Sequence, residues 1–134
     1  MKAVFVDTNV ILDVLLQNDG FWQDSLEIFQ YAERKEIQAY VSASSMTDIF
    51  YVAKKKLTTP VARVAMENLL DLFAIVGIDE SDLRGALSLP LADMEDALQV
   101  WCAMKANCDE LITRDIGGFE NVDISLVTPT EFVV

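Results

Sequence analysis

The sequence contains no histidine and has little cysteine, proline or glycine. Its 134 residues include 2 Cys, 3 Pro and 5 Gly. Without histidine there is no Ser-His-Asp triad, no Cys-His pair and no histidine zinc site. Cys102 and Cys108 do not form a CxxC pair, so we expect buried, reduced thiols and a cytoplasmic protein. The scarcity of Gly and Pro leaves no linker, which predicts one domain over residues 1–134.

Long apolar runs are absent as well. The apolar N-terminal run Ala3–Val6 stops at Asp7, so it predicts neither a signal peptide nor a membrane span. The rest of the sequence also lacks a run long enough to cross a bilayer, and we expect no membrane contact. Hydrophobic residues make up 52% of the chain and the mean hydropathy is +0.28, which favours a folded core over disorder.

Positive charge is scarce. There are 10 Lys and Arg against 22 Asp and Glu, giving a formal net charge of -12. A chain of this charge repels polyanions as a whole, so any binding to one depends on local groups. The only basic run of three residues is Lys54–Lys56. It is a candidate contact for a polyanion, and the alternative is the end of a helix that simply faces solvent.

Short β-rich segments alternate with helical patterns along the chain. The predicted strands are Lys2–Val6, Ile37–Val41, Ala74–Ile78, Leu111–Thr113 and Ile124–Val127. The predicted helices span residues 8–16, 21–35, 46–56, 59–73, 80–87 and 93–106. This alternation predicts an α/β fold with a parallel sheet between two layers of helices.

Several acidic residues follow the predicted strands. Asp7 comes directly after the first predicted strand and Asp115 just after the fourth, and the carboxyl ends of these strands lie at one edge of a parallel sheet. Asp48 is expected in the first turn of the helix after the second strand, and Asp93 and Asp96 share a face at the start of another helix. None has an evident Lys or Arg partner. Clustered carboxylates raise one another's pKa, and a hard divalent cation such as Mg²⁺ or Mn²⁺ would offset this repulsion.

Each of these acids also has a purely structural interpretation. Asp7 and Asp93 are suitable helix N-caps, and Ser45 with Asp48 matches a capping box. Asp115 precedes Ile116-Gly117-Gly118 and is suitable for a turn. Taken together, however, acids from distant parts of the chain are predicted to meet at one edge, which capping alone does not require.

Four segments resemble the acidic motifs of the PIN-domain family. They are Val6-Asp7-Thr8-Asn9-Val10, Asp48-Ile49-Phe50-Tyr51-Val52, Asp93-Met94-Glu95-Asp96-Ala97-Leu98-Gln99 and Ile112-Thr113-Arg114-Asp115. The resemblance covers nearly the whole chain, in order, and is strongest to single-domain, VapC-type toxins of toxin–antitoxin pairs. It implies a PIN-like three-layer α/β/α fold with a central parallel sheet.

The resemblance also implies a Mg²⁺- or Mn²⁺-dependent endoribonuclease. By match, Asp7, Asp48, Asp96 and Asp115 take the catalytic, metal-binding positions. The family commonly has Glu at the second position, so the shorter Asp48 is expected to reach the metal directly or through water. Asp93, Asn9 and Thr113 are expected behind these ligands, with capping or strand-end roles as the alternatives. Because histidine is absent, a carboxylate or water acidified by the metal must supply the base.

The resemblance suggests three partners. RNA is the substrate, with Lys54, Lys55, Lys56 and Arg114 as candidate contacts. A basic antitoxin suits the acidic site. The aromatic residues Phe21, Trp22, Phe29, Phe50 and Tyr51 supply core or a partner or dimer surface, and we expect a homodimer.

The alternative function is a non-catalytic PIN-like module that binds RNA or protein. A haloacid-dehalogenase phosphatase is disfavoured because Asp7-Thr8-Asn9 lacks the second acid of Asp-x-Asp. A response-regulator receiver is disfavoured because neither a phospho-accepting Asp at the end of a middle strand nor the required late Lys is evident.

Overall fold

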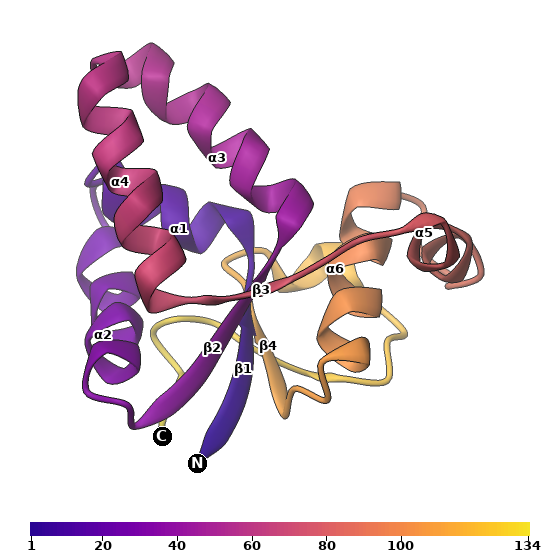
Figure 1. Ribbon diagram of the computed structural model, residues 1–134. Helices are drawn as coiled ribbons and strands as arrows, with labels where there is room; N and C mark the ends of the chain where they lie inside the picture. The colour runs from indigo at the N-terminus through magenta and orange to yellow at the C-terminus, as the bar shows by residue number, and fades with distance from the viewer.

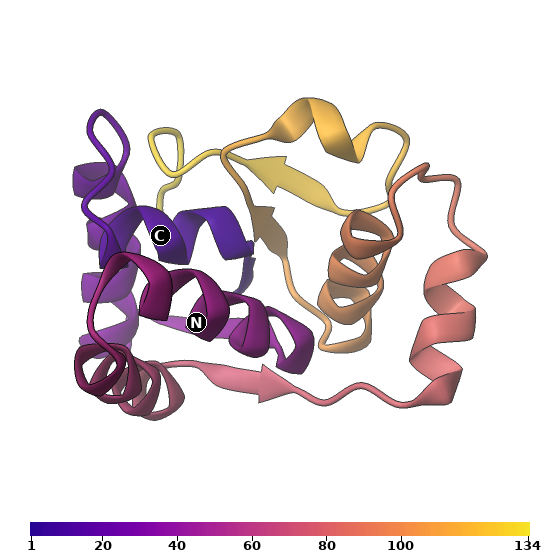
Figure 2. The ribbon, with the colours of Figure 1, turned by 90° about the horizontal axis from the view of Figure 1, so that it is seen from above.

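The computed structural model describes all residues, 1–134, and arranges them in three layers (Figures 1 and 2). In chain order the elements are β1 (Lys2–Val6), α1 (Thr8–Leu15), α2 (Trp22–Glu33), β2 (Ile37–Ser42), α3 (Ala43–Lys56), α4 (Thr59–Leu72), β3 (Ala74–Val76), α5 (Glu80–Leu87), α6 (Met94–Lys105), β4 (Glu110–Ile112), a 3₁₀ helix η1 (Ile116–Phe119) and β5 (Ser125–Val127). The predicted alternation of strands and helices is confirmed.

All five strands are parallel, in the order β3-β2-β1-β4-β5. The first strand is therefore central, with β2 and β4 on either side. Val6, the last residue of β1, pairs with Ile112, the last residue of β4. The carboxyl ends of the central strands consequently lie together, as the sequence pattern predicted.

Alternate residues of β1 face different helix layers. Val4 and Val6 belong to a core cluster shared with α1, α2, α3 and α4, whereas Phe5 belongs to a second cluster shared with α5, α6 and η1. Successive side chains of a strand point to opposite faces, so this fully buried strand is apolar throughout. The fold is the predicted three-layer α/β/α arrangement.

The start of α3 differs from the prediction. This helix begins at Ala43, three residues earlier than expected, because the Ser42 hydroxyl accepts a hydrogen bond from the Ser45 backbone N–H and caps it. Ser45 therefore lies inside the helix, and its predicted capping box with Asp48 is wrong. Asp48 lies in the second turn rather than the first, which frees its carboxylate from capping.

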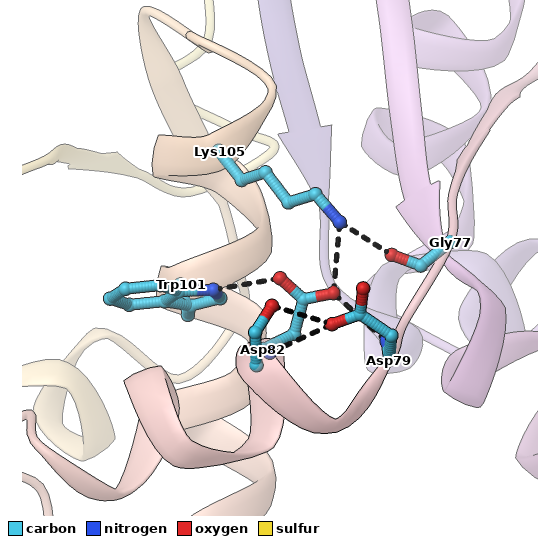
Figure 3. Close-up of polar contacts among 6 residues, drawn as sticks. Gly77, Asp79, Asp82, Trp101 and Lys105 are labelled. Atoms are coloured by element: carbon cyan, nitrogen blue, oxygen red, sulfur yellow. Dashed lines mark hydrogen bonds and ion pairs between the residues drawn. The ribbon is translucent and has the colours of Figure 1, made fainter.

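Helices α5 and α6 are joined by a buried acid, as Figure 3 shows. Asp82 of α5 is only 3% exposed and accepts hydrogen bonds from Trp101 Nε1 (3.0 Å) and Lys105 Nζ (2.8 Å). Its other contact is a capping box with Asp79. Lys105 also donates to the Gly77 carbonyl, so this network ties α5 and the segment before it to α6, the helix that carries Asp96.

The two cysteines can be compared with the prediction of buried, reduced thiols. Cys102 is buried, Cys108 is partly buried, and both are free thiols. Burial raises the pKa of the Cys102 thiol to about 11 and that of Cys108 to about 12. None of the helices combines the length and the apolar character that crossing a membrane would require.

Candidate functional site

A cavity of about 390 Å³ opens beside the carboxyl ends of β1 and β2, between α1, α3 and α6. Four acidic residues line it: Asp7, Asp48, Glu95 and Asp96. The polar residues Thr8, Asn9, Ser44, Ser45 and Gln99 and the apolar or aromatic residues Leu12, Tyr51 and Val52 complete its wall. Three of the four predicted ligand positions therefore share one cavity.

Asp7 is the most firmly held of these acids. It is 8% exposed and caps α1 by accepting a hydrogen bond from the Thr8 backbone N–H through Oδ1 (2.8 Å). Oδ1 also accepts from Gln99 Nε2 (3.0 Å), and Oδ2 accepts from Thr113 Oγ1 (2.8 Å). A carboxylate has about four lone-pair positions, so these bonds leave one free, on Oδ2, for a ligand in the cavity. The predicted capping role and a ligand role are thus compatible.

Gln99 was not predicted from the sequence, yet it connects Asp7 to the start of α3. Its side chain is 5% exposed, and its Oε1 accepts hydrogen bonds from the hydroxyls of Ser42 (2.9 Å) and Ser45 (3.3 Å). Ser45 in turn accepts from Thr8 Oγ1 (2.8 Å). A fully bonded buried network of this kind fixes the rotamer of the acid it surrounds.

Asp96 and Asp115 approach each other across Gly118. A Cβ at residue 118 would lie 3.3 Å from Asp96 Oδ2 and 3.4 Å from Asp115 Oδ2, so glycine keeps open the space between the two carboxylates. Burial, together with the charges of Asp93, Asp7 and Asp115, raises the pKa of Asp96 to about 6. Asp115 does not line the cavity itself but lies beside the acid that does.

Asp48 and Glu95 form a second acidic pair across the same cavity. The pKa of Glu95 is raised, because its carboxyl group shares a hydrogen bond with Asp48, because it is partly desolvated, and because Asp48, Asp93 and Asp96 add negative charge. Sequence reasoning assigned no role to Glu95. The signal was its position next to Asp96, at the first turn of a helix that begins at the cavity.

These acids have the chemistry of a site for a hard divalent cation. None of the five ion pairs in the molecule includes Asp7, Asp48, Glu95, Asp96 or Asp115. Burial and the neighbouring negative charges, which together raise the pKa of Asp96, and the open space beside Gly118 both suit a cation with oxygen ligands. The side chains surround the cavity but are not in a ligating arrangement: no group of three or more converges closely enough to hold an ion.

The residues expected behind the ligands have clear positions. Thr113 is buried and orients Asp7, while its hydroxyl also accepts from the Asp115 backbone N–H (3.1 Å). Asn9 accepts from the Arg114 backbone N–H (3.4 Å). Asp93 is the N-cap of α6 and accepts from the Asp96 backbone N–H (2.9 Å), so the capping interpretation applies to it.

The basic candidates divide into two groups. Arg114 forms an ion pair with the buried Asp13 (Nε–Oδ2, 2.9 Å), and its guanidinium lies over the Phe21 ring. Lys54, Lys55 and Lys56 form no ion pair and end α3, the helix that carries Asp48. Arg114 therefore pairs its charge with a buried acid of the same molecule, whereas the three lysines form no ion pair.

Fold and site together define a class: a parallel three-layer α/β/α domain with unpaired carboxylates at the carboxyl edge of its central strands. The PIN domain family model matches residues 3–117, and the chain belongs to this family. Its sequence is 25% identical over 136 residues to ribonuclease VapC1 of Aquifex aeolicus (strain VF5), covering 98% of this chain and 93% of that protein.

Solved structures show the same fold. A toxin–antitoxin complex from Klebsiella pneumoniae matches with a TM-score of 0.69 at 23% identity, covering 96% of this chain and 99% of that chain. The DNA-bound VapBC from Salmonella typhimurium matches with a TM-score of 0.71 at 15% identity and the same coverage. At these identities the likeness establishes the fold.

Proposed function

We propose that this protein is a divalent-metal-dependent endoribonuclease that acts as the toxin of a type II toxin–antitoxin pair. The observation that carries the proposal is the set of unpaired acids around one cavity, Asp7, Asp48, Glu95 and Asp96, with Asp115 adjoining. Membership of the PIN domain family and the relation to a VapC ribonuclease support it.

In this proposal Asp7, Asp96 and Asp115 hold Mg²⁺ or Mn²⁺, and Asp48 does so directly or through water. When bound, the cation would lower the pKa of a water molecule and stabilise negative charge on the phosphodiester. Asp7 supplies a fixed oxygen, because Gln99 and Thr113 hold its carboxylate. Glu95, whose pKa is raised beside Asp48, is a candidate to accept the proton of the attacking water.

The test is cleavage of single-stranded RNA by wild type, Asp7→Asn and Asp96→Asn with Mg²⁺ or Mn²⁺. We expect the cleavage rate to fall by at least about 100-fold in each variant, because each substitution removes a negatively charged ligand of the cation. Cleavage should vanish in EDTA, which removes the cation itself. Asp109→Asn, an exposed acid at the opposite edge of the sheet, is the charge-matched control. Equal cleavage in all four proteins would refute the metal-nuclease function and favour a non-catalytic PIN-like binding module.

The proposed partners follow from the same site and from the relatives. A basic antitoxin segment would neutralise the acidic cavity, and several of the similar structures are toxin–antitoxin complexes. We also propose a cytoplasmic homodimer, supported by apolar side chains left exposed on α4, where Val61, Val64 and Leu70 are 52%, 56% and 55% exposed. Light scattering on the purified chain measures its oligomeric state directly.

A further inference from the structure

Positive charge that is free to bind a partner is concentrated on one arm of the molecule. Five of the basic side chains, Lys2, Arg34, Arg84, Lys105 and Arg114, are in ion pairs. The others are Lys35, Lys54, Lys55, Lys56 and Arg63, and all of these except Lys35 lie on α3 and α4. Figure 1 shows these two helices side by side, with α3 starting directly after β2 at the carboxyl edge of the sheet and α4 running back toward β3. In a protein of net charge -12, this arm is where a polyanion meets least repulsion.

One face of α3 connects the cavity to this charge. Asp48, Tyr51 and Lys55 are at positions i, i+3 and i+7, so they lie on the same face of the helix. At 1.5 Å per residue, Lys55 is roughly 10 Å further along the axis than Asp48. The face thus begins with an acid of the cavity, continues through an aromatic ring and ends with an ammonium group.

Tyr51 is unusual for an aromatic residue in this fold. It is 55% exposed, although it lines the same cavity as Asp7, Asp48 and Asp96. Lys55 Nζ lies 4.1 Å from its ring centroid and donates a hydrogen bond to its hydroxyl (2.7 Å). The ring is thereby held in place at one side while staying open to solvent. Exposed aromatic rings next to cations are the platforms on which unpaired nucleic-acid bases stack.

We propose that this face of α3 binds single-stranded RNA, with one base stacked on Tyr51 and the adjoining phosphate on Lys55, while Lys54 adds its charge from the neighbouring side of the helix. This inference rests on the proposed function and adds how the strand enters the site. This surface should select single strands over duplexes. A base in a duplex can cover the Tyr51 ring only after it leaves its stack, which costs a few kcal/mol. The acidic cavity itself would repel the strand, so the arm supplies the attraction that brings a phosphodiester to the carboxylates.

The test measures RNA binding in an Asp96→Asn background, in which the RNA is not consumed. The probe is a fluorescein-labelled 12-nucleotide RNA of mixed sequence, with its duplex as a second ligand. We expect Tyr51→Leu to weaken single-strand binding about tenfold or more, and Tyr51→Phe to bind within about twofold of the parent, since the ring alone stacks. Replacing Lys54 and Lys55 by Gln should reduce the slope of log K against log salt by about 0.7 per lost phosphate contact. Lys35→Gln, which removes one positive charge away from the arm, should leave binding unchanged.

A stacking readout separates this role from a structural one. In an RNA carrying 2-aminopurine, fluorescence should fall on binding to the parent and to Tyr51→Phe but not to Tyr51→Leu. Unchanged binding in the Tyr51→Leu and lysine variants, or equal affinity for duplex, would overturn the proposal and leave the arm to an acidic protein partner. If wild type cleaves RNA but substitution of Tyr51 has no effect on RNA binding, the proposed role of the α3 face is refuted and the nuclease function stands. If RNA binding depends on Tyr51 but wild type does not cleave RNA, the nuclease function is refuted and the role of the α3 face stands.

Discussion

Arg114 lies between Thr113 and Asp115 in sequence, but its side chain belongs to a different part of the molecule. Its guanidinium binds both oxygens of Asp13, a residue of α1 that is 1% exposed, and its backbone N–H donates to Asn9. Asp13 also accepts from Asn18 Nδ2 (2.8 Å). The pair therefore fixes the segment that carries Asp115 to α1, the helix that Asp7 caps.

We predict that this pair positions Asp115 and does not contact RNA. Asp13→Asn and Arg114→Gln should each lower kcat about tenfold with little change in KM, and the double variant should be no slower than the worse single variant, because the two residues act as one unit. Arg114→Gln should destabilise the fold more, by about 3 kcal/mol, since it leaves a buried carboxylate without its cation. Steady-state cleavage and urea unfolding measure these effects.

The control for this prediction is Lys2→Gln, which breaks an ion pair with Glu110 at the opposite edge of the sheet. It should leave kcat unchanged. If Arg114 instead bound RNA, Arg114→Gln would raise KM alone, and Asp13→Asn, which removes a negative charge, would not impair the enzyme.

The acids that follow strands could be predicted from the sequence, whereas the residues that orient them could not. Asp7 and Asp115 occupy the expected edge because strand ends in a parallel sheet define it. Gln99 has no comparable signal, since an amide inside a helix usually faces solvent, and the packing of α6 on β2 and β4 turns it toward Asp7. Glu95 was visible only as one acid of a run of three.

At the scale of the element, the order and type of the strands and helices could be predicted, but most of their ends could not. β1 and α5 have the predicted bounds, because a buried apolar run and a capping box mark their limits. The third strand ends at Val76 rather than Ile78, where Gly77 precedes the cap of α5. Helix α3 begins early because Ser42, not Ser45, makes the capping bond, a choice between two similar residues that tertiary structure decides.

The contact between α5 and α6 depends on the absence of a side chain at Gly85. A Cβ there would overlap the Trp101 ring, whose Nε1 is held by Asp82 (Figure 3). Alanine is favoured over glycine in a helix by about 1 kcal/mol, so an unconstrained Gly→Ala change should stabilise the protein. We predict that Gly85→Ala instead destabilises it by about 1–3 kcal/mol, because the ring must move.

Urea unfolding measures this effect. Gly77→Ala is the control, since its Cβ would have nothing within 4 Å and its backbone conformation suits an L residue. A Gly85→Ala variant at least as stable as the parent would show that α5 is free to shift on α6 and that the Asp82 network does not fix their packing.

At the scale of the whole molecule, the excess of acid is only partly explained by the site. Beyond the acids around the cavity, Asp13, Glu36, Glu80, Asp82 and Glu110 are neutralised in ion pairs, and the rest are solvated. Two acids of the site differ from these solvated ones, because Asp7 is buried and Asp96 is partly buried, and both lie near other carboxylates. Folding without a cation therefore costs free energy at this edge of the sheet.

We predict that this cost makes the stability of the metal-free protein fall with pH. The folded-state pKa of Asp96, about 6, lies above its ordinary value of 3.8, so the folded state binds more protons between these values. The contribution of Asp96 to stability is full below about pH 4 and is lost as the pH rises through 6. In EDTA, Asp96→Asn should therefore melt above wild type at pH 7.5, by roughly 3–6 °C because solvent screens part of the repulsion, and close to wild type at pH 4. Adding Mn²⁺ at pH 7.5 should raise the Tm of wild type and not that of Asp96→Asn.

Asp19→Asn, which removes an exposed acid far from the cavity, controls for net charge and should behave as wild type in both conditions. A wild-type Tm that does not respond to Mn²⁺, together with an Asp96→Asn difference that is the same at both pH values, would mean that these carboxylates neither repel one another nor bind a cation.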